Sequence, residues 1–411
     1  MRSIWLTTDF LHPMDRGGKI RTYNILKELH RYDDVTYLGF DGKVPGEEPL
    51  KRVSEYCQRA IAVTHRQSRR GEIRFFTELA ANVFSSLPYS VAKLRSKESE
   101  EKCAAELSRC ELDYMVVDFV HAAVNLPSNV PVPTILFQHN VEAVIWERLY
   151  QQQTNSVMRK YYELQWRRMF NFECDACRRF DTVIAVSEND AEKMRRDYGV
   201  KHVTAIPTAV DTDYFRPDPK ISRSPNTLVF TGSLDWTPNI DGLRWFVDLV
   251  MPIVARAIPN FKLNVVGRNP RPDLVAGIKG RTGVELVGRV PDVRPHVQGA
   301  VASVVPLLVG GGTRMKIFES LALDTPVVST TIGAEGLPLQ HNQHILIADT
   351  PEDFARETIK LLTDQIASTA LGSRGGEYVR EKFSAEAVAR EFAAICHGTV
   401  ERVRSRQKAV A

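Results

Sequence analysis

The sequence predicts an α/β protein made of two doubly wound domains, each built on a parallel sheet. Short apolar runs that read as strands alternate with helical patterns in both halves of the chain, and a segment with four prolines separates the halves at residues 206–226. Continuously apolar strands are typical of parallel sheets that helices cover on both faces. With 43% hydrophobic residues among 411, the chain has enough apolar side chains for two such cores.

Two sets of strand-like runs define the two predicted sheets. They are SIWLT, VTYLGF, AIAV, YMVVD, TILFQ and TVIAV in the first half, and TLVFTG, FKLNVVG, VELVG, VASVVPL, PVVST and HILIA in the second. The first domain is therefore expected over residues 1–206, a linker over 207–226 and the second domain over 227–385. Ligands of open α/β folds bind beyond the carboxyl ends of the strands, so the two domains should face each other across a ligand-binding cleft.

Charge and cysteine content exclude several classes of protein. A formal net charge of +4 is small for this length and predicts no nucleic-acid partner. The six cysteines are too scattered for a disulfide framework, which favours reduced thiols and a cytoplasmic location. Cys174 and Cys177 lack the second pair of a zinc site, so a buried structural pair is favoured. The start, MRSIWLTTDF, does not read as a signal peptide, and no run reaches the roughly 18 apolar residues of a membrane span.

The segment VGGGTRMKIFESLAL, residues 309–323, has the pattern of an anion-binding loop. It follows a predicted buried strand and precedes a helix for which Thr313 is a suitable N-cap residue. Backbone N–H groups and the positive end of the helix dipole then face an anion, and Arg314 and Lys316 add two charges. Glu319 lies about 9 Å further along the helix, at about 1.5 Å per residue, where a carboxylate can accept hydrogen bonds from a diol.

This spacing suits a ligand with a phosphate at one end and a ribose at the other. A glycine-rich turn followed by a solvated helix face is the alternative, and these residues alone leave it open.

Four stretches together resemble the retaining GT-B glycosyltransferases of family 4 over nearly the whole chain. They are DRGGKIRTYNILKEL at 15–29, QHNVEAVIWERL at 138–149, PTAVDTDYF at 207–215 and the long segment that runs from GRVPD at 288 to GAEGL at 337. The resemblance implies two Rossmann-like domains, the first for the acceptor and the second for a nucleotide sugar. It also implies that the final helices, residues 386–411, cross back to the first domain.

The resemblance implies a donor site in the second domain. Glu319 matches the second glutamate of the family's E-x7-E pair, which holds the ribose hydroxyls. Arg289 and Val290, in GRVPD, would lie near the base. The diphosphate would lie against the glycine loop and its cations, namely Gly310, Gly311, Gly312, Thr313, Arg314 and Lys316. The implied co-substrate is a UDP- or GDP-sugar, with no further cofactor and no metal.

In the first domain, the resemblance implies contacts to the donor's phosphate and sugar. Gly17 and Gly18 match a glycine loop that approaches the donor, and His139 matches the histidine that faces the reacting sugar. His139 would position sugar hydroxyls, while the departing phosphate oxygen would take the acceptor proton in a retaining front-face attack.

Two positions depart from the family pattern. Gly311 replaces the first glutamate of the pair, and Ser233 stands where an arginine is usual, with no lysine close behind it. We interpret this as compensation, in which Arg314 and Lys316 neutralise the leaving diphosphate and Arg268 is a second candidate. Asp211-Thr-Asp213 has the spelling of a metal-binding DxD pair, but its place in the linker favours a structural turn.

The acceptor side is marked by a predicted long helix over residues 157–180. Basic pairs stand at 159/160, 167/168 and 178/179, and an apolar stripe is formed by Tyr162, Trp166, Met169, Phe170 and Cys177. With Arg66, Arg69, Arg70 and Arg74, such a basic face could rest on anionic lipid at the inner face of the cell membrane. A solvated helix face explains the same pattern, and both interpretations stay open. Lipid contact would favour a sugar or lipid-linked sugar acceptor in cell-surface polysaccharide or glycolipid assembly.

Three other functions fit parts of the pattern. A nucleotide-sugar 2-epimerase of the same fold needs strong acid and base groups in the cleft, and the loss of the first glutamate counts against it. A dinucleotide-dependent dehydrogenase needs G-x-G-x-x-G after the first strand, which LTTDFLHPMDRGGK does not supply. A non-catalytic sugar-nucleotide binder would keep Glu319 and Arg314 and could lose His139.

Overall fold

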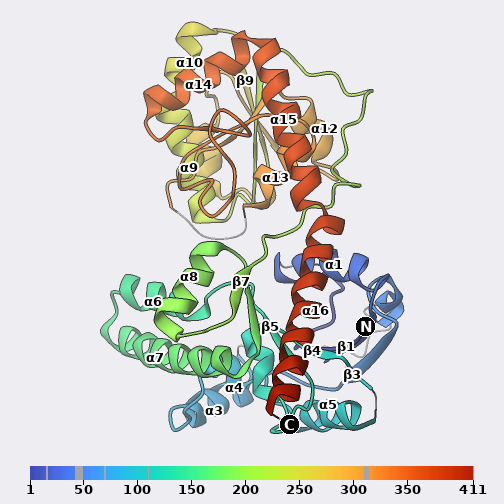
Figure 1. Ribbon diagram of the computed structural model, residues 1–411. Helices are drawn as coiled ribbons and strands as arrows, with labels where there is room; N and C mark the ends of the chain where they lie inside the picture. Colours follow the sequence, from blue (N-terminus) through green and yellow to red (C-terminus); the bar gives the residue numbers. More distant parts are fainter. Residues whose placement is uncertain (15–16, 42–49, 69–70, 110, 310–313, 411) are drawn as a thin grey trace. The chain divides into compact units, whose positions relative to one another are not determined.

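The computed structural model describes residues 1–14, 17–41, 50–68, 71–109, 111–309 and 314–410. The chain divides into two compact units (Figure 1). Unit 1 comprises Met1–Pro207 together with Val388–Ala411, and unit 2 comprises Thr208–Ala387. Each unit has its own parallel sheet, which confirms the predicted α/β class with two doubly wound domains.

The described part of unit 1 contains a seven-stranded parallel sheet in the order β3-β2-β1-β4-β5-β6-β7. The strands are β1 (Arg2–Leu6), β2 (Asp34–Phe40), β3 (Arg59–Val63), β4 (Tyr114–Asp118), β5 (Thr134–Phe137), β6 (Thr182–Ala185) and β7 (Val203–Ala205). Every strand predicted for the first half is present, whereas the three residues of β7 were not predicted. The strand order reverses between β1 and β4, so the carboxyl ends of these strands flank the crevice where doubly wound folds bind ligands.

Helices cover both faces of this sheet, and local sequence signals explain where several of them begin. They are α1 (Gly17–Leu29), α3 (Ile73–Asn82), α4 (Tyr89–Ala92), α5 (Lys97–Arg109), α6 (Glu142–Gln152), α7 (Ser156–Arg179), α8 (Glu188–Tyr198) and α16 (Ala385–Val410), with short 3₁₀ turns η1 (Val53–Glu55) and η2 (Val120–Asn125). The Asn155 side chain caps α7 by accepting hydrogen bonds from two backbone N–H groups. Ser187 caps α8 in the same way, and left-handed Gly199 ends it. The predicted long helix at 157–180 is confirmed as α7.

The end of the chain is part of the core of unit 1. On α16, Phe392 stacks on Trp5 of β1 with ring centroids 5.4 Å apart and meets Phe137 of β5 edge-on at 5.2 Å. His397 Nε2 lies 3.0 Å from Asp33 Oδ2, and Asp33 also accepts a hydrogen bond from the Tyr114 hydroxyl at 2.6 Å. Residues 388–410 therefore complete the hydrophobic packing around β1 and β5.

The described part of unit 2 contains a six-stranded parallel sheet in the order β10-β9-β8-β11-β12-β13. The strands are β8 (Thr227–Thr231), β9 (Lys262–Val266), β10 (Val284–Gly288), β11 (Ala302–Val305), β12 (Val327–Ser329) and β13 (Leu346–Ile347), each within a predicted run. The helices are α9 (Thr237–Trp245), α10 (Met251–Ala257), α11 (Pro272–Ile278), α12 (Arg294–Gln298), α13 (Met315–Ala322), α14 (Pro351–Thr363) and α15 (Gln365–Phe383), and the π-helical turn η3 (Phe246–Val250) joins α9 to α10. Here the strand order reverses between β8 and β11.

Residues 208–226, which the sequence marks as a linker, group with unit 2. The backbone N–H of Asp218 donates to Gln298 Oε1 at 2.9 Å, and Gln298 Nε2 donates back to the Asp218 carbonyl at 2.7 Å. Arg294 lies over the Tyr214 ring, 4.0 Å from its centroid. These contacts fasten the proline-rich segment to α12.

Among the helices that the structure describes, none has the length and apolar character needed to cross a bilayer.

Candidate functional site

Lys316 lies at the carboxyl end of β8 in unit 2. Lys316, on α13, donates from Nζ to Asn239 Oδ1 at 2.9 Å, and its ammonium lies 4.8 Å from the centroid of the Phe230 ring. A Cβ atom at Gly232 would lie 2.9 Å from the same Nζ, so the ammonium lies close to the Gly232 backbone. The chain thus brings Lys316 to the point where the strand order of unit 2 reverses.

Burial makes both charges on this face of α13 costly. Desolvation lowers the pKa of Lys316 to about 8, although the nearby Glu319 carboxylate opposes the shift. Desolvation likewise raises the pKa of Glu319 to about 7, against the effect of Lys316. Among the described residues, none donates a hydrogen bond to the Glu319 side chain. A ligand that brings an anion to Lys316 and hydroxyls to Glu319 would relieve both costs.

The structure begins α13 at Met315, later than the sequence predicts. Arg314 occupies the N-cap position with a left-handed backbone, φ 45° and ψ 33°. Glu319 is therefore about 6 Å along the helix from its first residue, at about 1.5 Å per residue, rather than about 9 Å from Thr313. The predicted loop residues Gly310, Gly311, Gly312 and Thr313 lie outside the described residues.

The two predicted cations on this segment have different surroundings. The Arg314 guanidinium donates from Nη2 to the Ile332 carbonyl at 3.0 Å and to Glu335 Oε2 at 3.2 Å. Its side chain is only 7% exposed. Arg314 is therefore held by a carboxylate and a carbonyl of unit 2, whereas Lys316 stands at the end of β8.

Arg268 lies beside the position where the family's arginine is missing. Its Nε donates to Ser233 Oγ at 3.4 Å, and the Ser233 hydroxyl donates to Asp235 Oδ1 at 2.6 Å. A Cβ atom at Gly267 would lie 1.8 Å from the Gly232 carbonyl oxygen, so the loops after β8 and β9 touch through two glycines. This close approach places the exposed Arg268 guanidinium next to Ser233.

The remaining predicted donor residues lie at the end of β10. Arg289 is exposed, and Val290 is partly buried against a small apolar cluster that includes Val229 and Val266. In the predicted DxD pair, Asp211 Oδ1 accepts hydrogen bonds from the backbone N–H groups of Asp213 and Tyr214 at 3.2 and 2.9 Å. Asp211 therefore stabilises a turn. No cluster of three or more metal-ligating side chains occurs among the described residues.

In unit 1, a histidine and an aspartate meet at the carboxyl ends of β5 and β4. His139 Nε2 lies 2.8 Å from Asp118 Oδ1, and the Thr22 hydroxyl donates to Asp118 Oδ2 at 2.9 Å. A Cβ atom at Gly18 would lie 3.3 Å from His139 Cδ2, whereas one at Gly17 would meet nothing within 4 Å. Gly18 thus lets the start of α1 approach the imidazole ring. Asp118 was not predicted, although an aspartate at the end of the run YMVVD was a usable signal.

Arg21 is the buried centre of this site. It lies 4.2 Å from the centroid of the Phe137 ring and donates to the carbonyl oxygens of Gln138, Ala185 and Ile206. Burial lowers its pKa to about 9, and the charge of Asp118 opposes that shift. Arg21 Nη1 also lies 3.4 Å from His139 Nδ1. Because arginine only donates hydrogen bonds, His139 Nδ1 is the acceptor of this one, and the Nε2–H group of the ring donates to Asp118. Both ring nitrogens are therefore engaged, and a substrate hydroxyl can bind the ring only by replacing one of these contacts.

A second pair of titratable groups lies beside His139. Phe119 has φ 74°, and its ring lies 4.7 Å from that of His121 and 5.4 Å from that of His139. His121 Nε2 is 3.8 Å from Glu142 Oε2. Burial lowers the pKa of His121 to about 4 and, with help from the Glu173 charge, raises that of Glu142 to about 7. Both groups and the left-handed Phe119 therefore lie at the same edge of the sheet as His139.

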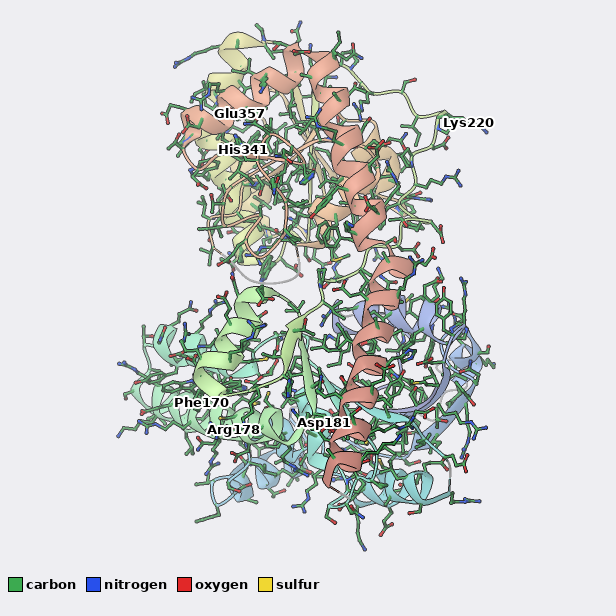
Figure 2. All side chains as sticks on the ribbon, in the orientation of Figure 1. Phe170, Arg178, Asp181, Lys220, His341 and Glu357 are labelled. Atoms are coloured by element: carbon green, nitrogen blue, oxygen red, sulfur yellow. The ribbon has the colours of Figure 1, made fainter. Side chains whose placement is uncertain are left out.

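The apolar stripe of α7 faces the interior of unit 1. Met169 and Cys177 are fully buried, and Trp166 stacks on Tyr150 of α6 at 5.7 Å. Figure 2 shows Phe170 and Arg178 on this helix; Phe170 meets the Tyr198 ring at 5.4 Å, and Arg178 Nε donates to the Tyr198 carbonyl at 2.6 Å. The stripe is therefore structural. Among the described residues, Cys57, Cys103, Cys174, Cys177 and Cys396 are free and buried.

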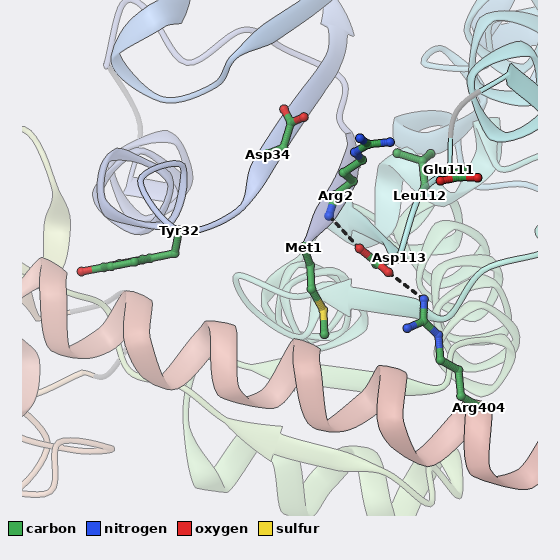
Figure 3. A pocket seen from close by; sticks show the side chains of 8 residues that line it. All are labelled: Met1, Arg2, Tyr32, Asp34, Glu111, Leu112, Asp113 and Arg404. Carbon is green, nitrogen blue, oxygen red and sulfur yellow. Dashed lines mark hydrogen bonds and ion pairs between the residues drawn. The ribbon is translucent and has the colours of Figure 1, made fainter.

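An open cavity of about 670 Å³ lies at the opposite, amino-terminal edge of the unit 1 sheet (Figure 3). The Asp113 side chain lines this cavity and accepts hydrogen bonds from the Arg2 backbone N–H at 2.9 Å and from the Arg404 guanidinium at 2.6 Å. Ligands of doubly wound sheets bind at the carboxyl ends of the strands, so this cavity is separate from the predicted site residues.

Two Rossmann-like units, each with polar side chains gathered at the carboxyl ends of its strands, give the chain the GT-B architecture. Residues 17–214 match the family model described as Glycosyltransferase Family 4, and residues 225–364 match the one described as Glycosyl transferases group 1. The two models together cover most of the chain, which is therefore a GT-B glycosyltransferase of the family 4 type, an enzyme that uses a nucleotide-sugar donor.

Similar proteins include a 44.6 kDa uncharacterized protein in the cps region of Klebsiella pneumoniae, 23% identical over 94% of this chain and 97% of its own length. The GDP-mannose-dependent alpha-(1-6)-phosphatidylinositol monomannoside mannosyltransferase of Mycobacterium tuberculosis is 24% identical over 53% of this chain and 62% of its own length. The crystal structure of Anabaena HepE in complex with UDP superposes with a TM-score of 0.67 at 11% identity, covering 97% of this chain and 100% of that one. This structural likeness supports the fold.

Proposed function

We propose that the enzyme transfers a sugar from a UDP- or GDP-sugar to a lipid-linked sugar, with retention of anomeric configuration and without a metal ion. The observation that carries the donor part is the pair formed by Lys316 and Glu319 on one face of α13. Lys316 is a desolvated cation at the carboxyl end of β8, and Glu319 is a carboxylate to which none of the described residues donates a hydrogen bond. The pair suits the diphosphate and the ribose of one nucleotide.

In the proposed reaction, the acceptor oxygen attacks the anomeric carbon while the bond from that carbon to the phosphate oxygen breaks. The departing phosphate oxygen takes the acceptor proton. Negative charge grows on the diphosphate, and Lys316 stabilises it in a site with little water. Arg268 supplies a second positive charge from beside Ser233, which offers a local explanation for the missing arginine.

Unit 1 contributes orientation in this proposal. Asp118 and Arg21 fix the imidazole of His139 from its two nitrogens, and Gly18 keeps the start of α1 against the ring. His139 then positions the sugar by exchanging one of these contacts for a sugar hydroxyl.

The donor base and the acceptor class are proposed by analogy. One relative is named a GDP-mannose-dependent enzyme that acts on a phosphatidylinositol mannoside, and one similar structure contains UDP, so both nucleotide series are candidates. The lipid acceptor and the relative in a cps region support a role in cell-surface polysaccharide or glycolipid assembly. We propose that the enzyme works in the cytoplasm, at the inner face of the cell membrane.

The test of the donor site is calorimetric titration of the wild-type chain and Glu319→Gln with UDP, GDP and their 2′-deoxy forms, with and without Mg²⁺. We expect one series to bind, independently of Mg²⁺, and the variant to bind about 10- to 100-fold more weakly, because hydrogen bonds to a charged group contribute roughly 1.5–3 kcal/mol. Removing the 2′-hydroxyl from the nucleotide should lower the affinity of the variant by a smaller factor than the affinity of the wild type. An equal loss of affinity in both proteins would show that Glu319 does not bind the ribose.

A further inference from the structure

The outer face of α3 in unit 1 is apolar and exposed. Ile73, Phe76 and Phe84 have exposed fractions of 84%, 58% and 94%, and Val83 is 55% exposed. Thr77 and Ala80, which are also exposed, complete the face with uncharged side chains. Positions 73, 76, 77 and 80 recur at helical spacing and lie on one side of the helix axis, and Val83 and Phe84 follow in the turn after α3. We call these residues the α3 face.

The α3 face stands on a fixed support. On the opposite side of the helix, Phe75 meets the Tyr89 ring edge-on at 5.8 Å. Buried Asn82 accepts a hydrogen bond from Gln165 of α7 at 3.3 Å. Arg168 of α7 donates to the carbonyl oxygens of Asn82 and Val83 at 2.8 and 2.7 Å. These contacts hold the end of α3 and the start of the next loop against α7, with Phe84 pointing outward.

Positive charge borders the α3 face. Arg168 lies directly under it, and exposed Arg74 flanks it on α3 in an ion pair with Glu78. A cavity of about 340 Å³ opens two residues beyond Phe84, lined by Ser86, Leu87, Ala123, Asn171, Phe172, Asp175, Ala176, Arg179 and Phe180. Arg179 is exposed there, with Asp175 the one opposing charge in the lining. Phosphate headgroups are anions of a size and charge that such a border attracts.

From this arrangement, we propose that the α3 face docks on a lipid bilayer that carries anionic headgroups. Phe84, Phe76 and Ile73 enter the boundary between headgroups and acyl chains, while Arg168, Arg74 and Arg179 remain at headgroup level. An interfacial helix needs to sink only about 5–10 Å for this. The inference deepens the lipid-linked acceptor of the proposed function and rests on that part of it. It also assigns lipid contact to α3, because the aromatic stripe of α7 is turned inward.

The size of the α3 face argues against a second copy of the chain as its occupant. The helix has ten residues and is about 15 Å long. Aromatic side chains bury roughly 150–250 Å² each, so the two phenylalanines offer about 300–500 Å², which is less than the about 800 Å² per partner of a stable interface. A bilayer has no such minimum, because it accepts individual side chains.

The test is co-sedimentation of the full chain with vesicles of phosphatidylcholine alone and of phosphatidylcholine with about 30% phosphatidylglycerol, because an anionic surface attracts basic side chains. The variant is Phe76→Ser with Phe84→Ser, and the matched control is Ile366→Ser, an 85% exposed residue on α15 of unit 2. We expect the wild type and the control to bind anionic vesicles in a salt-sensitive way, and the double variant to bind about 10- to 100-fold more weakly. Circular dichroism checks that each variant is folded, and Phe84→Trp should show a blue-shifted emission on anionic vesicles.

Three results would overturn the proposal. They are no binding by the wild type, equal binding by the double variant, and a dimer of the wild type that the double variant converts to monomer. Nucleotide titration of the same samples separates this proposal from the proposed function. Vesicle binding without nucleotide binding would contradict only the proposed donor site. Nucleotide binding without vesicle binding would contradict only the proposal that the α3 face docks on a bilayer.

Discussion

At the scale of single residues, the proposed function depends on charged side chains in buried positions. Lys316 combines a hydrogen bond to Asn239, contact with the Phe230 ring and closeness to Gly232. An ammonium in such a place is destabilised until an anion joins it. Its pKa therefore gives a direct way to test whether the diphosphate binds there.

Nucleotide affinity should weaken as pH rises above about 8, because burial lowers the pKa of Lys316 to about 8 and a diphosphate binds its protonated form. Lys316→Met should bind more weakly at pH 7 and lose this pH dependence. The folded pKa lies below the unfolded value of 10.5, so the stability linked to this lysine is present above pH 10.5 and is lost as pH falls through about 8. The ligand-free variant should therefore be more stable than the wild type at pH 7.

Titration calorimetry between pH 6.5 and 9.5 and thermal unfolding at pH 7 measure these two effects. The control is Lys360→Met, an exposed lysine on α14 of the same unit. An unchanged pH profile in Lys316→Met would place the diphosphate elsewhere.

Asp118→Asn should lower turnover by about tenfold or more and leave nucleotide affinity unchanged. The carboxylate accepts hydrogen bonds from His139 and Thr22 and balances buried Arg21, so its loss releases the imidazole from its orientation. Steady-state kinetics together with nucleotide titration separate the two effects. A variant with wild-type turnover would show that His139 needs no support from Asp118. Thr22→Val, which removes one hydrogen bond to the same carboxylate, should have a smaller effect.

At the scale of elements, contact between the loops after β8 and β9 shapes the candidate donor site. Gly267→Ala should destabilise unit 2 by about 1–3 kcal/mol and weaken nucleotide binding, because a Cβ atom there would lie 1.8 Å from the Gly232 carbonyl oxygen. Gly277→Ala is the matched control, since a Cβ atom at this helical position on α11 meets nothing within 4 Å, and it should be neutral or stabilising by up to about 1 kcal/mol. Chemical denaturation followed by tryptophan fluorescence gives both free energies. Equal effects of the two variants would mean that the loops can separate without cost.

At the scale of the whole molecule, we expect the two units to unfold in separate calorimetric transitions. Phe392→Ala removes an aromatic side chain that packs on Trp5 and Phe137, so it should destabilise unit 1 by about 3–5 kcal/mol. A nucleotide at about 100 times its dissociation constant should stabilise unit 2 by about 2.7 kcal/mol. Differential scanning calorimetry would therefore show the variant lowering one transition and the ligand raising the other. A single transition that responds equally to both would contradict this independence.

The sequence by itself determined the class of fold and the family. Each predicted strand was found because a strand in a parallel sheet is buried on both faces and must be continuously apolar. β7 escaped prediction because three residues are too few to carry that pattern. The family was equally readable, because glycine loops, strand-end polar residues and the linker signature are local in sequence. Glu319 and His139 could be predicted as site residues on that basis.

Only the tertiary structure decided how these side chains are grouped. Asp118, Arg21 and His139 come from three separated segments, and their partnership depends on strand order, which local periodicity does not encode. The sequence treated Arg314 and Lys316 as equivalent cations, yet the left-handed backbone of Arg314 turns it to Glu335 while Lys316 reaches β8. The apolar stripe on α7 likewise proved to be core, and α3 proved to be exposed. Periodicity shows that a helix has an apolar face, but packing alone decides whether another element covers it.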